Sequence, residues 1–204
     1  MYLTKTPFWL KALYPNLIWN KSRDEKKVYL SFDDGPTPEI TEWVLEELKK
    51  YEAKASFFLI GKNVKAFPEI SKRILQEGHS IGNHTQQHMN GWKNSCEDYM
   101  KEVDQCAELL DSKLFRPPYG RIKKSQIKAL RAQSYNIIMW DVLSGDFDIN
   151  LEAEDCFKTV VKGVRNGSII VFHDSQKAWP RLKGCLAKVL DHLKKEGYSM
   201  EALS

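Results

Sequence analysis

The sequence predicts a single α/β domain built around a parallel sheet. From Lys26 onward, short apolar strands alternate with longer amphipathic helices, and this alternation is typical of parallel strands joined by right-handed crossovers. A composition of 42% hydrophobic and 28% charged residues indicates a folded globular chain. At 204 residues, the chain is long enough to bury a substantial core. The pattern gives about seven strands, in an open sheet or a compact, irregular barrel.

The expected strands are short apolar runs, and the expected helices carry apolar residues on one face. The strands are Val28–Asp33, Ala55–Ile60, His79–Asn83, Leu114–Arg116, Asn136–Asp141, Ser168–His173 and Tyr198–Ala202. The helices are Glu39–Tyr51, Val64–Glu77, Ser95–Leu110, Lys123–Gln133, Glu152–Val164 and Arg181–Glu196. No linker or repeat interrupts this pattern, so residues 26–204 are expected to form one catalytic domain.

Residues 1–25 precede the pattern and are rich in aromatic side chains, including Phe8, Trp9, Tyr14 and Trp19. We expect this segment to pack on the domain; the alternative is contact with a membrane surface. No stretch is long enough for a transmembrane helix, and no secretory leader is recognisable. We therefore expect a cytoplasmic protein.

The net charge and the cysteines argue against several classes of protein. The net charge is only +4, and the lysines are spread along the expected helices, so we expect no nucleic-acid partner. The four cysteines show no Cys-x-x-Cys spacing. They indicate free thiols, and neither a disulfide framework nor a sulfur metal site.

Ionisable side chains follow the carboxyl ends of five expected strands. They are Asp33 with Asp34, His84, Arg116, Asp141 with Asp146, and His173 with Asp174. In a β/α barrel these ends meet on one face, where active sites are built. Folding alone does not require this clustering, so we expect a catalytic site there.

Two carboxylates and two imidazoles suggest a metal site. Asp33 and Asp34 precede Gly35 directly, where turn chemistry alone would need one carboxylate. His84 and His88 would lie on one face if their segment forms a helical turn; the alternative is a pair of surface histidines. Two imidazoles and the Asp34 carboxylate would leave positions open for water and substrate, as in catalytic zinc sites.

The remaining groups would act around this ion. Asp33 would accept a proton from the attacking water, with Arg116 keeping it ionised. The rigid Pro-Pro loop after Arg116 could present a backbone N–H to an oxyanion. His173 would be the general acid, because imidazole titrates near neutrality, oriented by either Asp146 or Asp174. The alternative for His173 is a buried core histidine.

Five motifs, in order, resemble those of the polysaccharide deacetylase family (the NodB-homology domain, carbohydrate esterase family four). Thr-Phe-Asp-Asp-Gly corresponds to Ser31–Gly35, and His-Ser/Thr-x-x-His to His84–His88. Arg-Pro-Pro-Tyr-Gly is intact at Arg116–Gly120. The fourth motif corresponds to Trp140–Phe147, and Leu-x-x-His-Asp to Ile170–Asp174. The ordered set is far more specific than any one motif.

The resemblance implies a distorted (β/α) barrel that binds one divalent metal ion, commonly zinc, with cobalt or manganese also used. It implies Asp34, His84 and His88 as the ligands. It also implies Asp33 as the base and His173 as the acid.

The resemblance further assigns the supporting groups. It implies that Arg116 tunes Asp33, that Asp146 tunes His173, and that the backbone N–H of Tyr119 binds the oxyanion. It thereby favours Asp146 over Asp174 as the partner of His173.

The substrate pocket departs from the family pattern at two positions. Phe147 replaces the usual Trp of the fourth motif, and Ile170 the usual Leu of the fifth. Both are implied to line the pocket for the acetyl methyl, and Pro117 and Trp140 are expected to contact substrate. Leu143 replaces an Asp of the fourth motif and is given no role.

The expected activity is removal of N-acetyl groups from an N-acetylglucosamine-containing glycan, such as a chitooligosaccharide or peptidoglycan. The same site could instead hydrolyse an O-acetyl ester, because both reactions share the attack step. A related class in the superfamily opens cyclic amides. A binding module without catalysis is disfavoured, because every catalytic position is filled.

Overall fold

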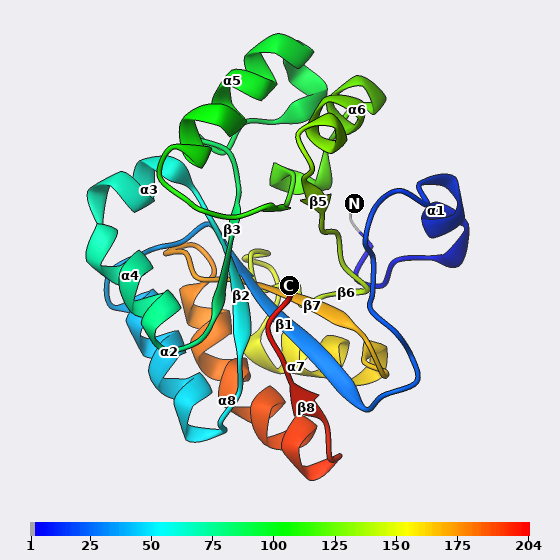
Figure 1. Ribbon diagram of the computed structural model, residues 1–204. Coiled ribbons are helices and arrows are strands. Elements are labelled where there is room, and N and C mark those ends of the chain that lie inside the picture. Colours follow the sequence, from blue (N-terminus) through cyan, green and yellow to red (C-terminus); the bar gives the residue numbers. More distant parts are fainter. Residues whose placement is uncertain (1–2) are drawn as a thin grey trace.

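The structure, a computed structural model, describes residues 3–204 and contains a parallel sheet that curls into a half-barrel (Figure 1). The strand order is β5-β4-β3-β2-β1-β7-β6, and β8 pairs with the start of β1. The strands are β1 (Lys27–Asp33), β2 (Ala55–Leu59), β3 (Ser80–Asn83), β4 (Leu114–Phe115), β5 (Asn136–Ile137), β6 (Val142–Leu143), β7 (Ile169–His173) and β8 (Ser199–Met200). The predicted parallel, barrel-like α/β fold is confirmed.

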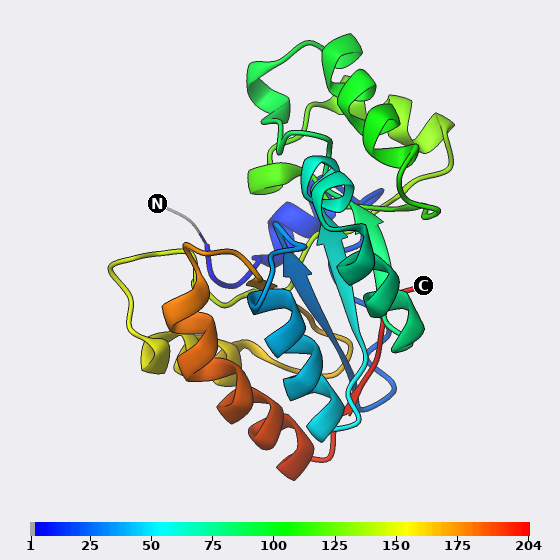
Figure 2. The ribbon, with the colours of Figure 1, turned by 90° about the vertical axis from the view of Figure 1, so that its left-hand side faces the viewer.

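Helices cover the convex side of the sheet, where α2 and α8 run side by side (Figure 2). The helices are α1 (Phe8–Leu13), α2 (Ile40–Lys50), α3 (Gly61–Ala66), α4 (Pro68–Gln76), α5 (Cys96–Ala107), α6 (Lys124–Ala132), α7 (Ala153–Gly163) and α8 (Trp179–Lys195). Two short 3-10 helices, η1 (Gly91–Lys93) and η2 (Pro118–Gly120), lie in the loops after β3 and β4. None of the helices in residues 3–204 combines the length and apolar character that crossing a membrane would need.

Alternate side chains of the central strands enter different layers. Leu30 and Phe32 of β1 belong to the core packed under α2 and α8, where the Phe32 ring stacks on Phe57 with centroids 5.1 Å apart. Ser31 and Asp33 face the concave side, because strand side chains alternate between faces. Burial of the apolar face stabilises the sheet by about 1.5–3 kcal/mol per large side chain. It leaves the polar residues at the strand ends on the other face.

Two expected elements are interrupted. The expected helix Val64–Glu77 is two helices, α3 and α4, because Pro68 has no N–H and disfavours helical geometry at Phe67, where φ is −134° and ψ is 60°. Of the expected strand Asn136–Asp141, only Asn136–Ile137 forms a strand, β5, and β6 begins after it at Val142.

The residues between β5 and β6 do not form a strand, because their backbone groups hydrogen-bond with Arg116 and with the N-terminal segment. The Arg116 guanidinium donates to the carbonyls of Ile138 (3.3 Å) and Met139 (3.2 Å). Ile18, from the N-terminal segment, bridges to Ile138, and its carbonyl accepts the Met139 N–H at 2.7 Å. These contacts satisfy peptide groups that a continuous strand would have placed in a ladder.

The N-terminal segment lies along the edges of the sheet. The Thr6 N–H donates to the Asp141 carbonyl, and the Leu143 N–H donates to the carbonyl of Thr4. Leu17 and Trp19 are buried. In α1, Leu10 packs against the core, whereas Phe8, Trp9 and Leu13 are exposed. The segment is therefore part of the folded body, with α1 at its periphery (Figure 1).

Candidate active site

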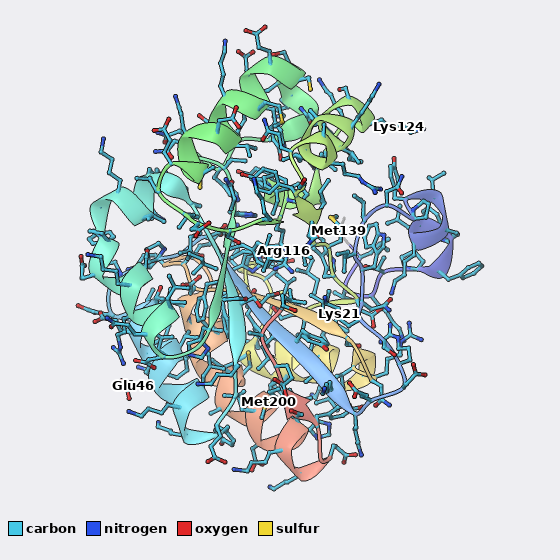
Figure 3. All side chains as sticks on the ribbon, viewed as in Figure 1. Lys21, Glu46, Arg116, Lys124, Met139 and Met200 are labelled. Carbon is cyan, nitrogen blue, oxygen red and sulfur yellow. The ribbon has the colours of Figure 1, made fainter. Side chains whose placement is uncertain are left out.

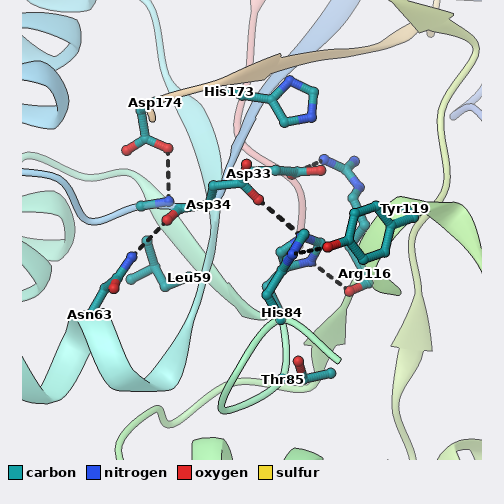
Figure 4. A network of polar contacts seen from close by, with 12 residues as sticks. Asp33, Asp34, Leu59, Asn63, His84, Thr85, Arg116, Tyr119, His173 and Asp174 are labelled. Atoms are coloured by element: carbon teal, nitrogen blue, oxygen red, sulfur yellow. Dashed lines mark hydrogen bonds and ion pairs between the residues drawn. The ribbon is translucent and has the colours of Figure 1, made fainter. Parts of the chain in front are cut away.

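The end of β1 turns sharply at Asp34, whose φ is 80°. Such a conformation is costly for a non-glycine residue and needs support from its surroundings. The Asn63 side-chain amide donates to the Asp34 carbonyl at 2.8 Å, and the Gly35 N–H donates to Asp174 Oδ1 at 3.1 Å. The turn directs the two adjacent carboxylates to different partners (Figure 4).

Asp34 faces two imidazoles. Its Oδ1 lies 3.2 Å from Nε2 of His88 and 3.7 Å from Nε2 of His84. The donor atoms of all three residues lie within 4.8 Å of one another, so the group could hold a metal ion. Asp34 Oδ1 is buried and has no well-aligned hydrogen bond. Such an orphaned acceptor between two imidazoles fits a cation.

Hydrogen bonds and burial set the protonation of these groups. His84 Nδ1 lies 2.7 Å from the Arg116 carbonyl and donates its proton there, which leaves Nε2 free to bind a metal. Burial lowers the pKa of His84 to about 4, so the ring is neutral. Burial acts to raise the pKa of Asp34, but the contact with His88 and the charge of His173 bring it below its ordinary value. A neutral imidazole and a carboxylate are the forms that bind metal ions.

The segment His84–His88 is an irregular loop, so the expectation of a helical turn is wrong. The Asn83 side chain accepts the Thr85 N–H at 2.8 Å, and Thr85 and His88 both have positive φ, of 65° and 59°. The Gln86 N–H donates to the Glu102 carbonyl of α5. Side-chain and long-range partners thus replace the helical bonds, and the two rings still approach to 5.0 Å.

Asp33 pairs with a fully buried arginine. Arg116 Nη1 lies 2.7 Å from Asp33 Oδ1 and 2.8 Å from Ser31 Oγ, and the guanidinium packs 4.0 Å from the Phe58 ring centroid. Figure 3 shows Arg116 at the centre of the molecule. Burial lowers the pKa of Arg116, and Asp33 acts in the opposite direction. Arginine remains charged throughout the physiological range.

His173, at the end of β7, is held by Asp146. The His173 Nδ1 lies 2.8 Å from Asp146 Oδ1, and the His173 backbone N–H donates to Oδ2 at 2.8 Å. Burial acts to lower the pKa of His173, but the charge of Asp146 and this hydrogen bond raise it to about 9. The imidazole is therefore protonated at neutral pH, with its Nε2–H directed away from Asp146.

Asp174 has a different task. Its carboxylate accepts hydrogen bonds from the Gly35 N–H and the Thr41 hydroxyl, and it does not contact His173 in these bonds. Burial raises the pKa of Asp174 to about 8. Asp174 therefore supports the turn after β1, whereas Asp146 orients the imidazole.

The loop after β4 presents Tyr119 beside the imidazoles. Tyr119 has φ 59° and ψ 8° and is 61% exposed, and its hydroxyl lies 3.1 Å from His88 Nδ1. Pro117 is buried just before it. A Cβ on Gly120 would lie 2.5 Å from the Trp140 ring, so Trp140 packs directly on this loop.

On the other side of the site, the Phe147 ring packs edge-on against the His173 imidazole, with the ring centroids 5.1 Å apart.

Two expectations about the site are wrong. Ile170 is fully buried in the core under α8 and does not share a face with His173. Val171, two residues before His173, is on that face and was missed, although the period of two predicts it. Asp141 lies near the start of β7, where it pairs with Lys11 (2.5 Å) and Arg23 (2.9 Å). It is thus away from the strand ends that carry the site.

Sequence reasoning also missed the residues that hold the site in shape. Ser31 shares the face of Asp33 and accepts from Arg116; the strand period could have identified it. Asn83 and Asn63 hold backbone groups beside the candidate ligands. No sequence signal distinguishes these two from ordinary turn and helix residues.

Comparisons with known proteins identify the family. A family model described as polysaccharide deacetylase matches residues 20–138, and the chain belongs to this family. The resemblance of the ordered motifs and the prediction of a hydrolase are confirmed.

Individual relatives agree with this membership. A peptidoglycan-N-acetylglucosamine deacetylase of Bacillus cereus is 34% identical, over 95% of each chain. A chitooligosaccharide deacetylase of Azorhizobium caulinodans is 30% identical, over 75% of this chain and 76% of its own. A crystal structure of a peptidoglycan N-acetylglucosamine deacetylase with 4-naphthalen-1-yl-N-oxidanyl-benzamide gives a TM-score of 0.88. That chain is 33% identical, with 97% of this chain and 95% of that chain covered.

Proposed function

We propose that this protein removes N-acetyl groups from N-acetylglucosamine residues of an oligo- or polysaccharide, using one divalent metal ion. The observation that carries the proposal is the buried, unsatisfied Oδ1 of Asp34 facing the Nε2 atoms of His84 and His88. The names of the peptidoglycan and chitooligosaccharide deacetylases among its relatives support the substrate class.

Asp34, His84 and His88 would hold the ion. Two neutral imidazoles and one carboxylate suit Zn²⁺, and Co²⁺ or Mn²⁺ are alternatives with the same donor set. When bound, the ion would polarise the acetyl carbonyl and acidify the attacking water. The Arg116 carbonyl and the Tyr119 hydroxyl, on the other nitrogens of the two rings, would fix the ligands' orientation.

Asp33 would accept the proton of the attacking water. Arg116 holds one carboxylate oxygen at 2.7 Å, which leaves the other free for that proton. Because Arg116 also contacts Ser31 and two backbone carbonyls, it cannot swing away, and Asp33 stays in one orientation. The backbone N–H of Tyr119 would donate to the oxyanion that forms at the acetyl carbon.

His173 would protonate the leaving amine, which departs poorly as an anion. Asp146 accepts from Nδ1, so the proton on Nε2 is the one delivered. Phe147 at the His173 ring and Trp140 on the Gly120 loop would form apolar walls near the acetyl group, together with Pro117 and Val171. The products are a free amine and acetate.

The experiment that tests this function measures free amine and free acetate separately. Substrates would be N-acetylglucosamine oligomers, an O-acetylated xylan and a cyclic amide, with Asp33→Asn as the inactive control. We expect amine and acetate in equal amounts from the oligomers. Acetate from xylan alone would establish the esterase alternative, and ring opening alone the cyclic-amide alternative.

A further inference from the structure

Two loops leave the candidate site together and end in exposed side chains. The loop after His88 runs to Trp92, and the loop through Tyr119 runs to Arg121. They touch at their start, where the Tyr119 hydroxyl meets His88. They also touch further out, because a Cβ on Gly91 would lie 2.5 Å from the Arg121 carbonyl. Trp92 follows His88 by four positions, so their Cα atoms lie within about 14 Å of each other.

The Trp92 ring is fixed although it is exposed. It is 60% exposed, and its Nε1–H donates to the Ile122 carbonyl at 3.2 Å. The carbonyl of Gly91, just before it, accepts from the buried Gln126 side chain at 2.9 Å. One edge of the ring is therefore anchored while much of its surface meets solvent. A rigid, exposed indole binds a flat apolar surface without paying side-chain entropy.

Arg121 carries a charge that the protein does not neutralise. Its guanidinium lies 5.4 Å from the centroid of the Trp92 ring. Within residues 3–204, no carboxylate oxygen comes within 4.0 Å of it. A guanidinium beside an aromatic face, without an acidic partner, is suited to a carboxylate on a bound ligand.

We propose that Trp92 and Arg121 form a subsite for a sugar residue next to the one that is deacetylated, and that this neighbouring sugar carries a carboxylate. The C–H face of the sugar ring packs on the indole, and the carboxylate pairs with the guanidinium. The inference rests on the proposed deacetylase function and narrows its substrate to an acidic glycan. An uncharged N-acetylglucosamine chain uses the indole alone.

The test compares one glycan with and without its charge. Peptide-free chains of alternating N-acetylglucosamine and N-acetylmuramic acid carry a free carboxylate on each muramic residue, and amidation removes these charges. For the wild-type protein we expect kcat/KM to be roughly ten-fold higher on the charged chains, mainly through KM, as one charge-assisted contact allows. Arg121→Gln should remove this preference, and so should high salt.

Trp92→Ala tests the indole contact separately from the guanidinium contact of Arg121. It should raise KM several-fold on charged chains, on amidated chains and on a neutral N-acetylglucosamine tetramer alike, with kcat nearly unchanged. Arg131→Gln on α6 and Trp9→Ala on α1 are matched controls, because both side chains are exposed away from the two loops. Thermal unfolding midpoints confirm that each variant folds.

Equal kcat/KM of the wild type on charged and amidated chains would overturn the proposal. So would an Arg121→Gln variant that keeps the preference, or a Trp92→Ala variant with unchanged KM. If no chain releases amine, the deacetylase function itself fails. Retardation of the protein in gels containing charged or amidated chains then decides the subsite, because it needs no turnover.

Discussion

Asp33 and Asp34 are neighbours in sequence, yet their surroundings give them different chemistry. Asp33 is tied to the buried Arg116 guanidinium, whereas Asp34 faces two imidazole nitrogens. The positive φ of Asp34, supported by Asn63 and Asp174, produces this difference. One carboxylate can then take a proton while the other contributes to an ion site.

Replacing Asp33 by Asn removes the proposed base and keeps the shape of the side chain. We expect kcat to fall by about 10²–10⁴, the usual contribution of a positioned general base. Metal content should stay that of the wild type, because Asp33 is not among the three candidate ligands. Amine release and metal analysis on the same sample measure both. A variant with near wild-type kcat would remove Asp33 from the mechanism.

Asp146→Asn tests the proposed acid through pH. Asp146 raises the pKa of His173 to about 9. Its loss leaves only the weaker charges of Asp34 and Asp33 to oppose burial, and so lowers that pKa. The alkaline limb of the kcat profile should therefore move to lower pH, by more than about one unit. An unchanged alkaline limb would show that His173 is not the group whose deprotonation ends activity.

The same pair has a signature in stability. The pKa of His173 in the folded protein, about 9, lies above its value of 6.5 in the unfolded chain. The pair therefore contributes stability that is fully present below pH 6.5 and is lost as pH rises through 9. The contribution is at most about 3 kcal/mol. Urea unfolding of metal-free wild type and Asp146→Asn across this range should show the difference shrinking with rising pH; a constant difference would contradict the pairing.

At the scale of elements, Arg116 connects β1, β4 and the gap between β5 and β6. Its guanidinium contacts Asp33, Ser31 and the carbonyls of Ile138 and Met139. Arg116→Met would leave a buried carboxylate and two carbonyls without donors. We expect a loss of about 3–5 kcal/mol in the free energy of unfolding.

Urea titration measures that loss. Arg131→Met, at an exposed position of α6, is the matched control, with an expected change below about 0.5 kcal/mol. Equal effects of the two substitutions would mean that Arg116 does not organise these elements.

The sequence patterns predict a helix or strand well where neighbouring residues set its boundaries. They predict it poorly where residues far along the chain set those boundaries. β1 and β7 follow from apolar runs that end in polar residues, and β2 from an apolar run that ends just before Ile60 and Gly61. The break at Ile138 depends on Arg116 and on Ile18 of the N-terminal segment, so no local signal marks it. The break before Pro68, in contrast, could have been predicted from proline's effect on the preceding residue.

The candidate site shows the same division. Motifs and strand ends predict Asp34, His84 and His88, which the structure brings within 4.8 Å. The irregular loop that presents the histidines depends on Asn83 and on the backbone of α5, which spacing alone does not encode. Ile170 was misplaced because the motif puts it three residues before His173, an odd spacing that places the two side chains on opposite faces of β7. Val171, two residues before His173, lies on the same face as that histidine.

At the scale of the whole molecule, the half-barrel separates two charged centres. Asp141 lies near the start of β7 and pairs with Lys11 and Arg23 of the N-terminal segment, whereas His173 ends that strand. The Ser168 hydroxyl donates to Asp141. His173 follows Ser168 by five positions of extended chain, which span about 16 Å. The ion pairs of Asp141 therefore hold the N-terminal segment to the sheet, and the candidate active site lies at the opposite end of β7.

Asp141→Ala tests this separation. Loss of the buried carboxylate leaves Lys11 and Arg23 without their partner, but both remain partly hydrated. We expect a loss of about 1–3 kcal/mol in unfolding free energy and a kcat within about two-fold of the wild type in the folded protein. A large fall in kcat without loss of stability would place Asp141 in the site after all.

The central claim is that Asp34, His84 and His88 bind the one ion on which hydrolysis depends. The most direct measurement follows bound metal and amine release together, as stripped protein is titrated with Zn²⁺. We predict that activity rises in proportion to bound metal and levels off at one ion per chain, and that His84→Ala binds and hydrolyses far more weakly. Full activity in stripped protein, or a full ion complement in His84→Ala, would contradict the account.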